Sequence, residues 1–227
     1  MTNQDDANLL FRITSFRHVV DMFEARQLHL SHPSAWDDPY ERLVEHARQE
    51  SVFAQCWSKR ETSDAIWRIY SSDRMGLSIR TTRSRLAQAL EEANSTTPIE
   101  YCVMEVEYLA DAAAVSRASV LVHDARSAGE TVRGAMASLL IKRAAFDHEA
   151  EVRAIVHLLG DSPYGGAGPV LRVPIDPHRL VDQIVFDPRA DPIFMRMCVH
   201  YLRNSLNYAG EITRSRLYDQ NDYAIVV

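Results

Sequence analysis

The chain has 227 residues, of which 46% are hydrophobic and 25% charged, and its formal net charge is -6. This mixture is typical of a globular protein large enough to bury a core without cross-links, and the acidic balance disfavours a general nucleic-acid binder. The cysteines (Cys56, Cys102 and Cys198) are few and widely spaced, which argues against a disulfide framework or a zinc site.

The first half of the chain mixes short apolar runs with segments of helical spacing. Phe16, Val19 and Phe23 recur at three or four residues, which predicts a helix that starts at a serine or threonine cap before Phe16. We expect further helices after Ser63 and over 84–93. We expect strands at 9–13, 28–31, 52–57, 76–80 and 101–108.

The second half begins with a segment, 111–146, that we expect to be mostly helical with a break near 127–129. Strands are expected at 152–159, 171–175 and 183–186, and short ones near 211–217 and 223–227. Asp191 caps and Pro192 starts a last helix that runs to about Asn204. The glycine-rich stretch 162–169 opens no helix, so it does not fit a phosphate-binding loop.

The order of these elements predicts an α+β fold rather than a doubly wound one, because strands and helices do not alternate strictly. We expect a mixed, mainly antiparallel sheet flanked by helices. No repeat or linker divides the sequence, so residues 1–227 are expected to form a single domain with a flexible N-terminus at 1–8. That N-terminus lacks a basic segment and no apolar run approaches a membrane span, so we expect a cytoplasmic protein.

The segment Glu149-Ala-Glu151-Val-Arg153 lies where the long helical region gives way to a strand. Alternate residues of a strand share one face, so these three charges are expected to line up together. Such a row is either a solvated charge stripe or a site in which one carboxylate orients a hydroxyl and the other tunes its ionisation. We therefore take Glu151 and Glu149 as candidate catalytic residues and Arg153 as a candidate ligand-binding residue.

Arg12 is flanked by Phe11 and Ile13, and an arginine in an apolar strand is costly unless it is paired. It either grips a phosphate or carboxylate of a ligand or pairs with an internal glutamate. Ser58 ends another strand and faces the same side as Cys56, for which we expect a structural role because no base is near in sequence. Arg12 and Ser58 are candidate ligand-binding residues.

Trp36 and Asp38 belong to an irregular turn at 32–41 that either forms a ligand wall or caps a helix beginning at Pro39. Both are candidate ligand-binding residues. Trp67 and Tyr70 lie about one helical turn apart, a spacing more typical of core packing than of a cofactor site. The histidines show no zinc-binding spacing and no serine lies in a nucleophile-elbow motif, so we predict no metal site.

Several short motifs follow one another along the chain in an order and spacing that can be compared with known families. They are Phe11-Arg12, Leu28-His-Leu-Ser-His-Pro-Ser-Ala-Trp-Asp-Asp-Pro-Tyr-Glu41, Cys56-Trp57-Ser58, Ala65-Ile-Trp67-Arg-Ile-Tyr70 followed by Gly76, and Lys142 and Phe146 before Glu149-Ala-Glu151-Val-Arg153. In this order the chain resembles the bacterial domain of unknown function 2971 family over most of residues 10 to 190. It departs from that family at Asp37, where asparagine is usual, and at Phe146, where tryptophan is usual.

A second resemblance is to ADP-ribosyltransferases, in which an arginine or histidine strand, a Ser-x-Ser strand and a Glu-x-Glu strand follow one another. Arg12, Cys56-Trp-Ser58 and Glu149-Ala-Glu151 occur in that order, with Cys56 in place of the first serine. The resemblance implies that NAD is the substrate, held by Arg12, with Ser58 orienting the nicotinamide ribose. It implies that Glu151 bonds the ribose hydroxyl and stabilises the charge formed as nicotinamide leaves, and that Glu149 activates the acceptor.

Three functions therefore stay open. The first is a NAD-consuming, ADP-ribosyltransferase-like effector, of the bacterial toxin or phage-defence kind, that acts on a small-molecule nucleotide or a macromolecular acceptor. The second is a nucleic-acid-processing enzyme that uses Glu149 and Glu151 with a divalent metal, which the net charge of -6 disfavours. The third is a binding module without catalysis. The sequence does not define the oligomeric state.

Overall fold

The computed structural model describes residues 8–36, 38, 51–61, 63–160 and 169–219. The strands are β1 (Leu9–Ser15), β2 (Gln27–Ser31), β3 (Val52–Ser58), β4 (Gly76–Thr82), β5 (Ile99–Glu105), β6 (Glu107–Leu109), β7 (Ile141–Arg143), β8 (Glu151–Leu158), β9 (Val170–Pro174), β10 (Gln183–Phe186) and β11 (Glu211–Arg214). The helices are α1 (Phe16–Ala25), α2 (Asp64–Tyr70), α3 (Arg83–Asn94), α4 (Asp111–Ser127), α5 (Thr131–Ser138), α6 (Pro177–Leu180) and α7 (Pro192–Asn204). Two short 3-10 helices, η2 (Pro33–Ala35) and η5 (Ala144–Glu149), complete the described elements.

The main sheet branches at β3. One edge of β3 pairs along its length with β8, which in turn pairs with β5. The other edge meets β1 only at Phe11 and Ser58, and meets β2 only at Ser31 and Ala54. Beyond β1 the order continues through β4 and β10 to β11, and beyond β2 it continues to β9. All these pairings are antiparallel except that of β10 with β11, which confirms the predicted mixed, mainly antiparallel sheet.

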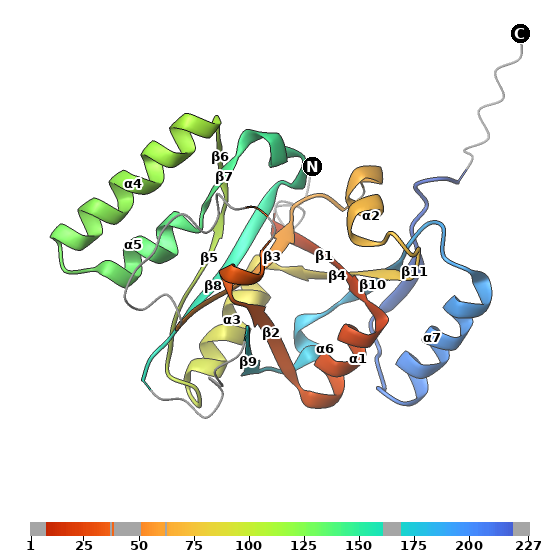
Figure 1. Cartoon of the computed structure of the whole chain (residues 1–227). Coiled ribbons are helices and arrows are strands. Elements are labelled where there is room, and N and C mark those ends of the chain that lie inside the picture. The colour runs from red at the N-terminus through yellow and green to blue at the C-terminus, as the bar shows by residue number, and fades with distance from the viewer. Residues whose placement is uncertain (1–7, 37, 39–50, 62, 161–168, 220–227) are drawn as a thin grey trace, which may run out of the picture.

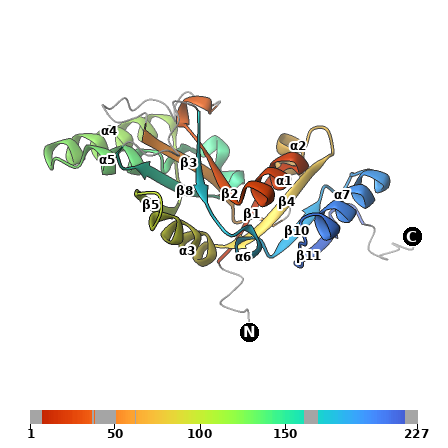
Figure 2. The ribbon, with the colours of Figure 1, turned by 90° about the horizontal axis from the view of Figure 1, so that it is seen from below.

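Helices cover both faces of this sheet. The larger core packs side chains of α1, α3 and α7 against strands including β4 and β10, and a smaller core packs α5 against the other face of β3 and β8. Figures 1 and 2 show α4 and α5 at one end of the molecule beside β5 and β8, and α7 at the opposite end beside β10 and β11. The α+β class is thus confirmed, whereas the extent of the domain over 1–227 stays a prediction.

Local sequence signals explain most helix starts. The side chains of Ser15 and Ser63 accept hydrogen bonds from backbone N–H groups at the starts of α1 and α2. Asp191 caps α7, which begins with Pro192 and ends at Asn204, as predicted. These caps satisfy backbone N–H groups in the first turn and so fix where each helix begins.

The prediction that 111–146 is mostly helical with a break near 127–129 is confirmed, but the strand β7 within this region was not expected. The break near 127–129 is present, because α4 ends at Ser127 and α5 starts at Thr131. The residues after α5 form β7 and then η5, since β7 finds a parallel partner in β6 that helical periodicity does not reveal. The expected strand over 101–108 is divided into β5 and β6 for the same reason. The flexible N-terminus at 1–8, the helix start at Pro39 and the strand at 223–227 fall outside the described residues, apart from Asn8.

Candidate functional site

A cavity of about 100 Å³ opens where β1 and β3 meet, with α2 along one side. Its polar lining includes Arg12 from β1, Ser58 from β3, Tyr70 from α2, and both Glu149 and Glu151. The cavity is smaller than the roughly 300–1,000 Å³ of most ligand pockets, so it fits one end of a ligand rather than a whole dinucleotide. The branch in the sheet creates this space, because β1 and β3 share only one paired position.

A buried lysine joins the two glutamates. Lys142 Nζ donates to Glu149 Oε2 and, over 2.8 Å, to Glu151 Oε1. The remaining oxygens also have partners, since the Tyr70 hydroxyl donates to Glu149 Oε1 over 3.0 Å and Arg153 Nε donates to Glu151 Oε2 over 2.6 Å. The cluster is therefore an internally paired set of buried charges, as burial of ions requires.

The two carboxylates differ in their ionisation. Burial and the hydrogen bond with Glu151 raise the pKa of Glu149 more than Lys142 lowers it. Burial acts in the same direction on Glu151, but the charge of Arg153, the hydrogen bond with Glu149 and Lys142 outweigh it and hold the Glu151 pKa well below its usual range. When one proton is shared by this pair, Glu149 carries it, and divergent pKa values of this kind are a feature of acid–base sites.

Glu149 does not lie on the strand that was expected to carry it. It ends η5, and Ala150, with a left-handed φ of 45°, turns the chain before β8 begins at Glu151. This turn rather than strand alternation is what directs both carboxylates to Lys142. The charge-stripe alternative was wrong, because Glu149, Glu151 and Arg153 are all buried.

Arg12 is half-buried, and its hydrogen-bond partner among the described residues is the Cys56 carbonyl, at 2.6 Å. No described acidic residue forms an ion pair with it, so most of its five N–H donors stay open to a ligand. Burial lowers the pKa of Arg12, while nearby Cys56 and Glu151 act in the opposite direction. A guanidinium in this position is suited to bind an anionic group.

Ser58 also lines the cavity, but its hydroxyl is already engaged. Its Oγ donates to the Glu149 carbonyl over 2.7 Å and accepts from Arg60 N over 3.0 Å. Ser58 therefore joins the end of β3 to the backbone beside Glu149, a function that differs from the ribose contact that the resemblance implied. Cys56 lines the same wall and is half-buried.

Three other candidates lie outside the cavity lining. Arg153 is fully buried, donates to the Leu139 carbonyl as well as to Glu151, and lies 4.6 Å above the ring of Trp36. Asp38 forms a two-bond ion pair with Arg143 over 3.1 and 3.2 Å. Their placement indicates support for the cluster, and ligand binding by Arg153, Trp36 or Asp38 stays a prediction.

Tyr70 and Trp67 were both expected in the core, and the structure separates them. Trp67 is 1% exposed and forms part of the cavity wall. Tyr70 is 52% exposed, so its assignment to the core was wrong. Its hydroxyl faces Glu149, and burial and that carboxylate raise the Tyr70 pKa. Tyr70 therefore stands at the mouth of the cavity.

Sequence reasoning also missed Lys142 as a member of the site. The signal that could have found it is that only Lys59 and Lys142 are lysines in an arginine-rich chain, and Lys142 directly follows the apolar run Leu139-Leu-Ile141. A lysine next to such a run is rarely buried without acidic partners.

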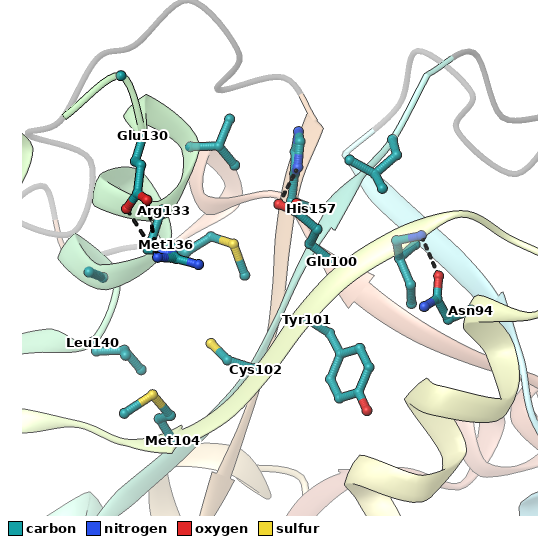
Figure 3. A pocket seen from close by; sticks show the side chains of 15 residues that line it. Asn94, Glu100, Tyr101, Cys102, Met104, Glu130, Arg133, Met136, Leu140 and His157 are labelled. Atoms are coloured by element: carbon teal, nitrogen blue, oxygen red, sulfur yellow. Dashed lines mark hydrogen bonds and ion pairs between the residues drawn. The ribbon is translucent and has the colours of Figure 1, made fainter. Parts of the chain in front are cut away.

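A larger groove of about 990 Å³ lies between α5 and β5, and Figure 3 shows its lining. Its polar side chains contact one another, since Arg133 pairs with Glu130 and His157 Nδ1 lies 3.3 Å from Glu100 Oε2. The backbone at the open edge of β5 is partly covered, since Asn94 accepts from Ile99 N and Arg83 donates to the Val103 carbonyl. The groove thus lacks a converging set of open polar groups, and the smaller cavity is the better candidate site.

No family model matches the chain, and no curated protein matches it. The resemblance to the domain of unknown function 2971 family therefore stays an expectation.

Three similar solved structures are of DarT from Thermus sp. 2.9. The complex with carba-NAD+ has a TM-score of 0.44 and 8% identity, with 92% of this chain and 96% of that chain covered. The complex with NAD+ has a TM-score of 0.43, 10% identity and coverage of 92% and 96%. The complex with ADP-ribosylated single-stranded DNA has a TM-score of 0.44, 10% identity and coverage of 93% and 95%.

The described residues contain neither a membrane-spanning helix nor a cluster of metal-binding side chains. None of their helices is both long and apolar enough to cross a membrane. Among the described residues, no three or more histidine, cysteine, aspartate or glutamate side chains lie close enough together to hold a metal ion.

Proposed function

We propose that this chain is a NAD-consuming, ADP-ribosyltransferase-like effector, of the kind used as bacterial toxins or in phage defence. The observation that carries the proposal is that one cavity joins Arg12, which has no acidic partner among the described residues, to the paired carboxylates Glu149 and Glu151. A ligand with an anionic group at one end and ribose hydroxyls at the other matches this arrangement.

The balance of charge supports an anionic ligand. Among the described residues, Lys142 and Arg153 form ion pairs with Glu149 and Glu151, whereas Arg12 at the cavity wall bonds the Cys56 carbonyl and no carboxylate. The pyrophosphate of NAD supplies the complementary charge, with bonds from a guanidinium fork to its oxygens.

The proposed reaction breaks the bond between ribose C1′ and the nicotinamide nitrogen. The bonding electron pair leaves with nicotinamide, which becomes neutral, and the positive charge develops on the ribose. An oxygen or nitrogen of the acceptor then forms the new bond to C1′, and its proton passes to a carboxylate of the site and on to water. Fixed negative groups beside the ribose favour this charge only in the transition state, which is what accelerates the step.

The acceptor that we propose is a small-molecule nucleotide or a macromolecule. Nucleic acid belongs among the acceptors to be tested, although the net charge of -6 gives it no general support.

The alternative of a metal-dependent nuclease fits the geometry less well. All four carboxylate oxygens of Glu149 and Glu151 already accept bonds from Lys142, Arg153 and Tyr70. A divalent cation that bound both glutamates would have to displace buried Lys142 or buried Arg153 from Glu151. The same cavity also fits a binding module that binds a nucleotide without cleaving it. Only a measurement of NAD turnover distinguishes this module from the transferase.

The test of the function is whether the purified protein releases nicotinamide from NAD. Nicotinamide is measured by chromatography, in reactions with and without nucleic-acid and protein acceptors. We expect release without added metal and in the presence of a chelator. The nuclease alternative predicts metal-dependent cutting of nucleic acid and no nicotinamide, and the binding module predicts ADP-ribose binding without either product. Either of those patterns would rule out the transferase.

Arg12→Gln is expected to weaken the binding of ADP-ribose by about 10- to 100-fold, because a charge-assisted hydrogen bond contributes about 1.5–3 kcal/mol. Calorimetric titration measures the affinity. Arg26→Gln is the matched control, since Arg26 pairs with Asp176 outside the cavity and its side chain is 59% exposed. Equal affinity in the Arg12 variant and the control would exclude Arg12 from the ligand site.

A further inference from the structure

The two glutamates do not offer their oxygens to a ligand equally. Glu151 is held at both oxygens by buried cations, with Lys142 at 2.8 Å and Arg153 at 2.6 Å. Glu149 Oε1 accepts instead from the hydroxyl of Tyr70, a residue that is 52% exposed. A hydrogen bond from a neutral hydroxyl is exchanged for one from a ligand hydroxyl more readily than a buried ion pair is broken.

We propose that Glu149 is the carboxylate that contacts the substrate, and that Lys142, held by Glu151, is the positioning residue that fixes it. The inference rests on the proposed function and deepens it, because the resemblance to ADP-ribosyltransferases gave the ribose-facing role to Glu151. In the transfer, a ligand hydroxyl replaces the Tyr70 hydroxyl at Glu149 Oε1. Glu149 then takes the proton that the acceptor loses as its bond to C1′ forms.

Glu151 acts as part of a rigid support. Arg153 is fixed from three sides, by Glu151, the Leu139 carbonyl and the ring of Trp36. Lys142 is buried, and its Nζ lies 4.8 Å from the ring centroid of Phe146. Glu151 bonds both Lys142 and Arg153. If Glu151 moved toward a ligand, both cations would lose that bond.

The titratable groups around Glu149 are consistent with a substrate-contacting Glu149 and a supporting Glu151. Glu151 from β8 raises the pKa of Glu149 and Lys142 from β7 lowers it, and Glu149 in turn raises the pKa of Tyr70 from α2 and of Tyr108 from β6. Burial raises the Glu149 pKa, so Glu149 exchanges its proton at a higher pH than Glu151, which stays ionised. The carboxylate able to gain and lose a proton is therefore also the one with the exchangeable partner.

The first experiment compares Glu149→Gln and Glu151→Gln in nicotinamide release across pH. Glu149→Gln should lower kcat by about 10²- to 10³-fold with KM for NAD nearly unchanged, the scale of losing one electrostatic group. It should also remove the acidic limb of the pH profile, whereas Glu151→Gln should keep that limb and lose less than about 10-fold. Glu100→Gln, in the α5–β5 groove, is the control and should match the wild type. Equal losses in the two site variants, or a larger loss in Glu151→Gln, would overturn the proposal.

The second experiment does not depend on any activity, and its titration is measured on the wild-type protein. Carbon-13 NMR of the side-chain carboxyl groups follows each glutamate of the wild-type protein as pH changes. We expect Glu149 to titrate above the usual glutamate range and Glu151 below it, with assignments from the two variants. The reverse order would overturn the proposal. A protein that released no nicotinamide but showed the expected order would refute the proposed reaction and leave Glu149 as the proton-exchanging group of the site.

Discussion

Lys142→Met should lower the free energy of unfolding by about 3–5 kcal/mol, the usual cost of removing one partner from a buried ion pair. Lys142 is 7% exposed and bonds both Glu149 and Glu151, so the variant leaves two buried carboxylates that share no cation between them. Methionine keeps much of the side-chain volume, so the loss reports charge rather than packing. Urea unfolding followed by circular dichroism measures it.

The only other lysine of the chain gives the matched control. Lys59 pairs with Glu105 at 2.6 Å, but these side chains are 40% and 55% exposed. Exposed pairs contribute about 1 kcal/mol or less, so Lys59→Met should unfold almost like the wild type. Similar losses in the two variants would show that the Lys142 cluster is not sealed from water.

The cost of Lys142→Met should also depend on pH. Arg153, the hydrogen bond with Glu149 and Lys142 together hold the pKa of Glu151 at about 2, below its unfolded value, so the stability that these partners provide is complete above the unfolded pKa. It is lost as pH falls from the unfolded value toward about 2, because both states then bind the proton. The difference between wild type and variant should therefore shrink over that range of acid pH.

Much of the fold was accessible from the sequence because local signals and burial agreed. The strand at 183–186 and the helix from Pro192 to Asn204 are at their predicted positions, with caps and apolar spacing that specify them independently. β7 was missed because three residues with one parallel neighbour carry no period of their own. A helical prediction over 111–146 extended across it, since propensity has no information about a distant partner strand.

The site was predictable in its residues and not in its geometry. Arg12, Ser58, Glu149 and Glu151 were chosen as polar groups at strand positions, and all four line one cavity. Their bonding could not be derived, because it depends on the left-handed turn at Ala150 and on a lysine that precedes the motif by seven residues. Whether a polar side chain contacts the ligand or positions other side chains depends on the hydrogen-bond partners that its atoms already have in the fold.

Trp67→Ala should lower the free energy of unfolding by about 3–5 kcal/mol, as for other large truncations of buried aromatic residues. Trp67 is 1% exposed and belongs to α2, which has only seven residues. A helix of that length is unstable alone, so its position depends on buried side chains such as Trp67 and Ile66. Denaturant unfolding with an unchanged m-value is the measurement.

The comparison for this prediction is Tyr70→Ala, in the same helix. Tyr70 is 52% exposed and contributes one hydrogen bond to Glu149, so its removal should cost about 1 kcal/mol. If Trp67→Ala cost as little as Tyr70→Ala, Trp67 would not anchor α2 and would become a surface for stacking a ligand ring. A large loss instead means that Trp67 places the Tyr70 hydroxyl over Glu149, so that packing in α2 sets the state of the cavity mouth.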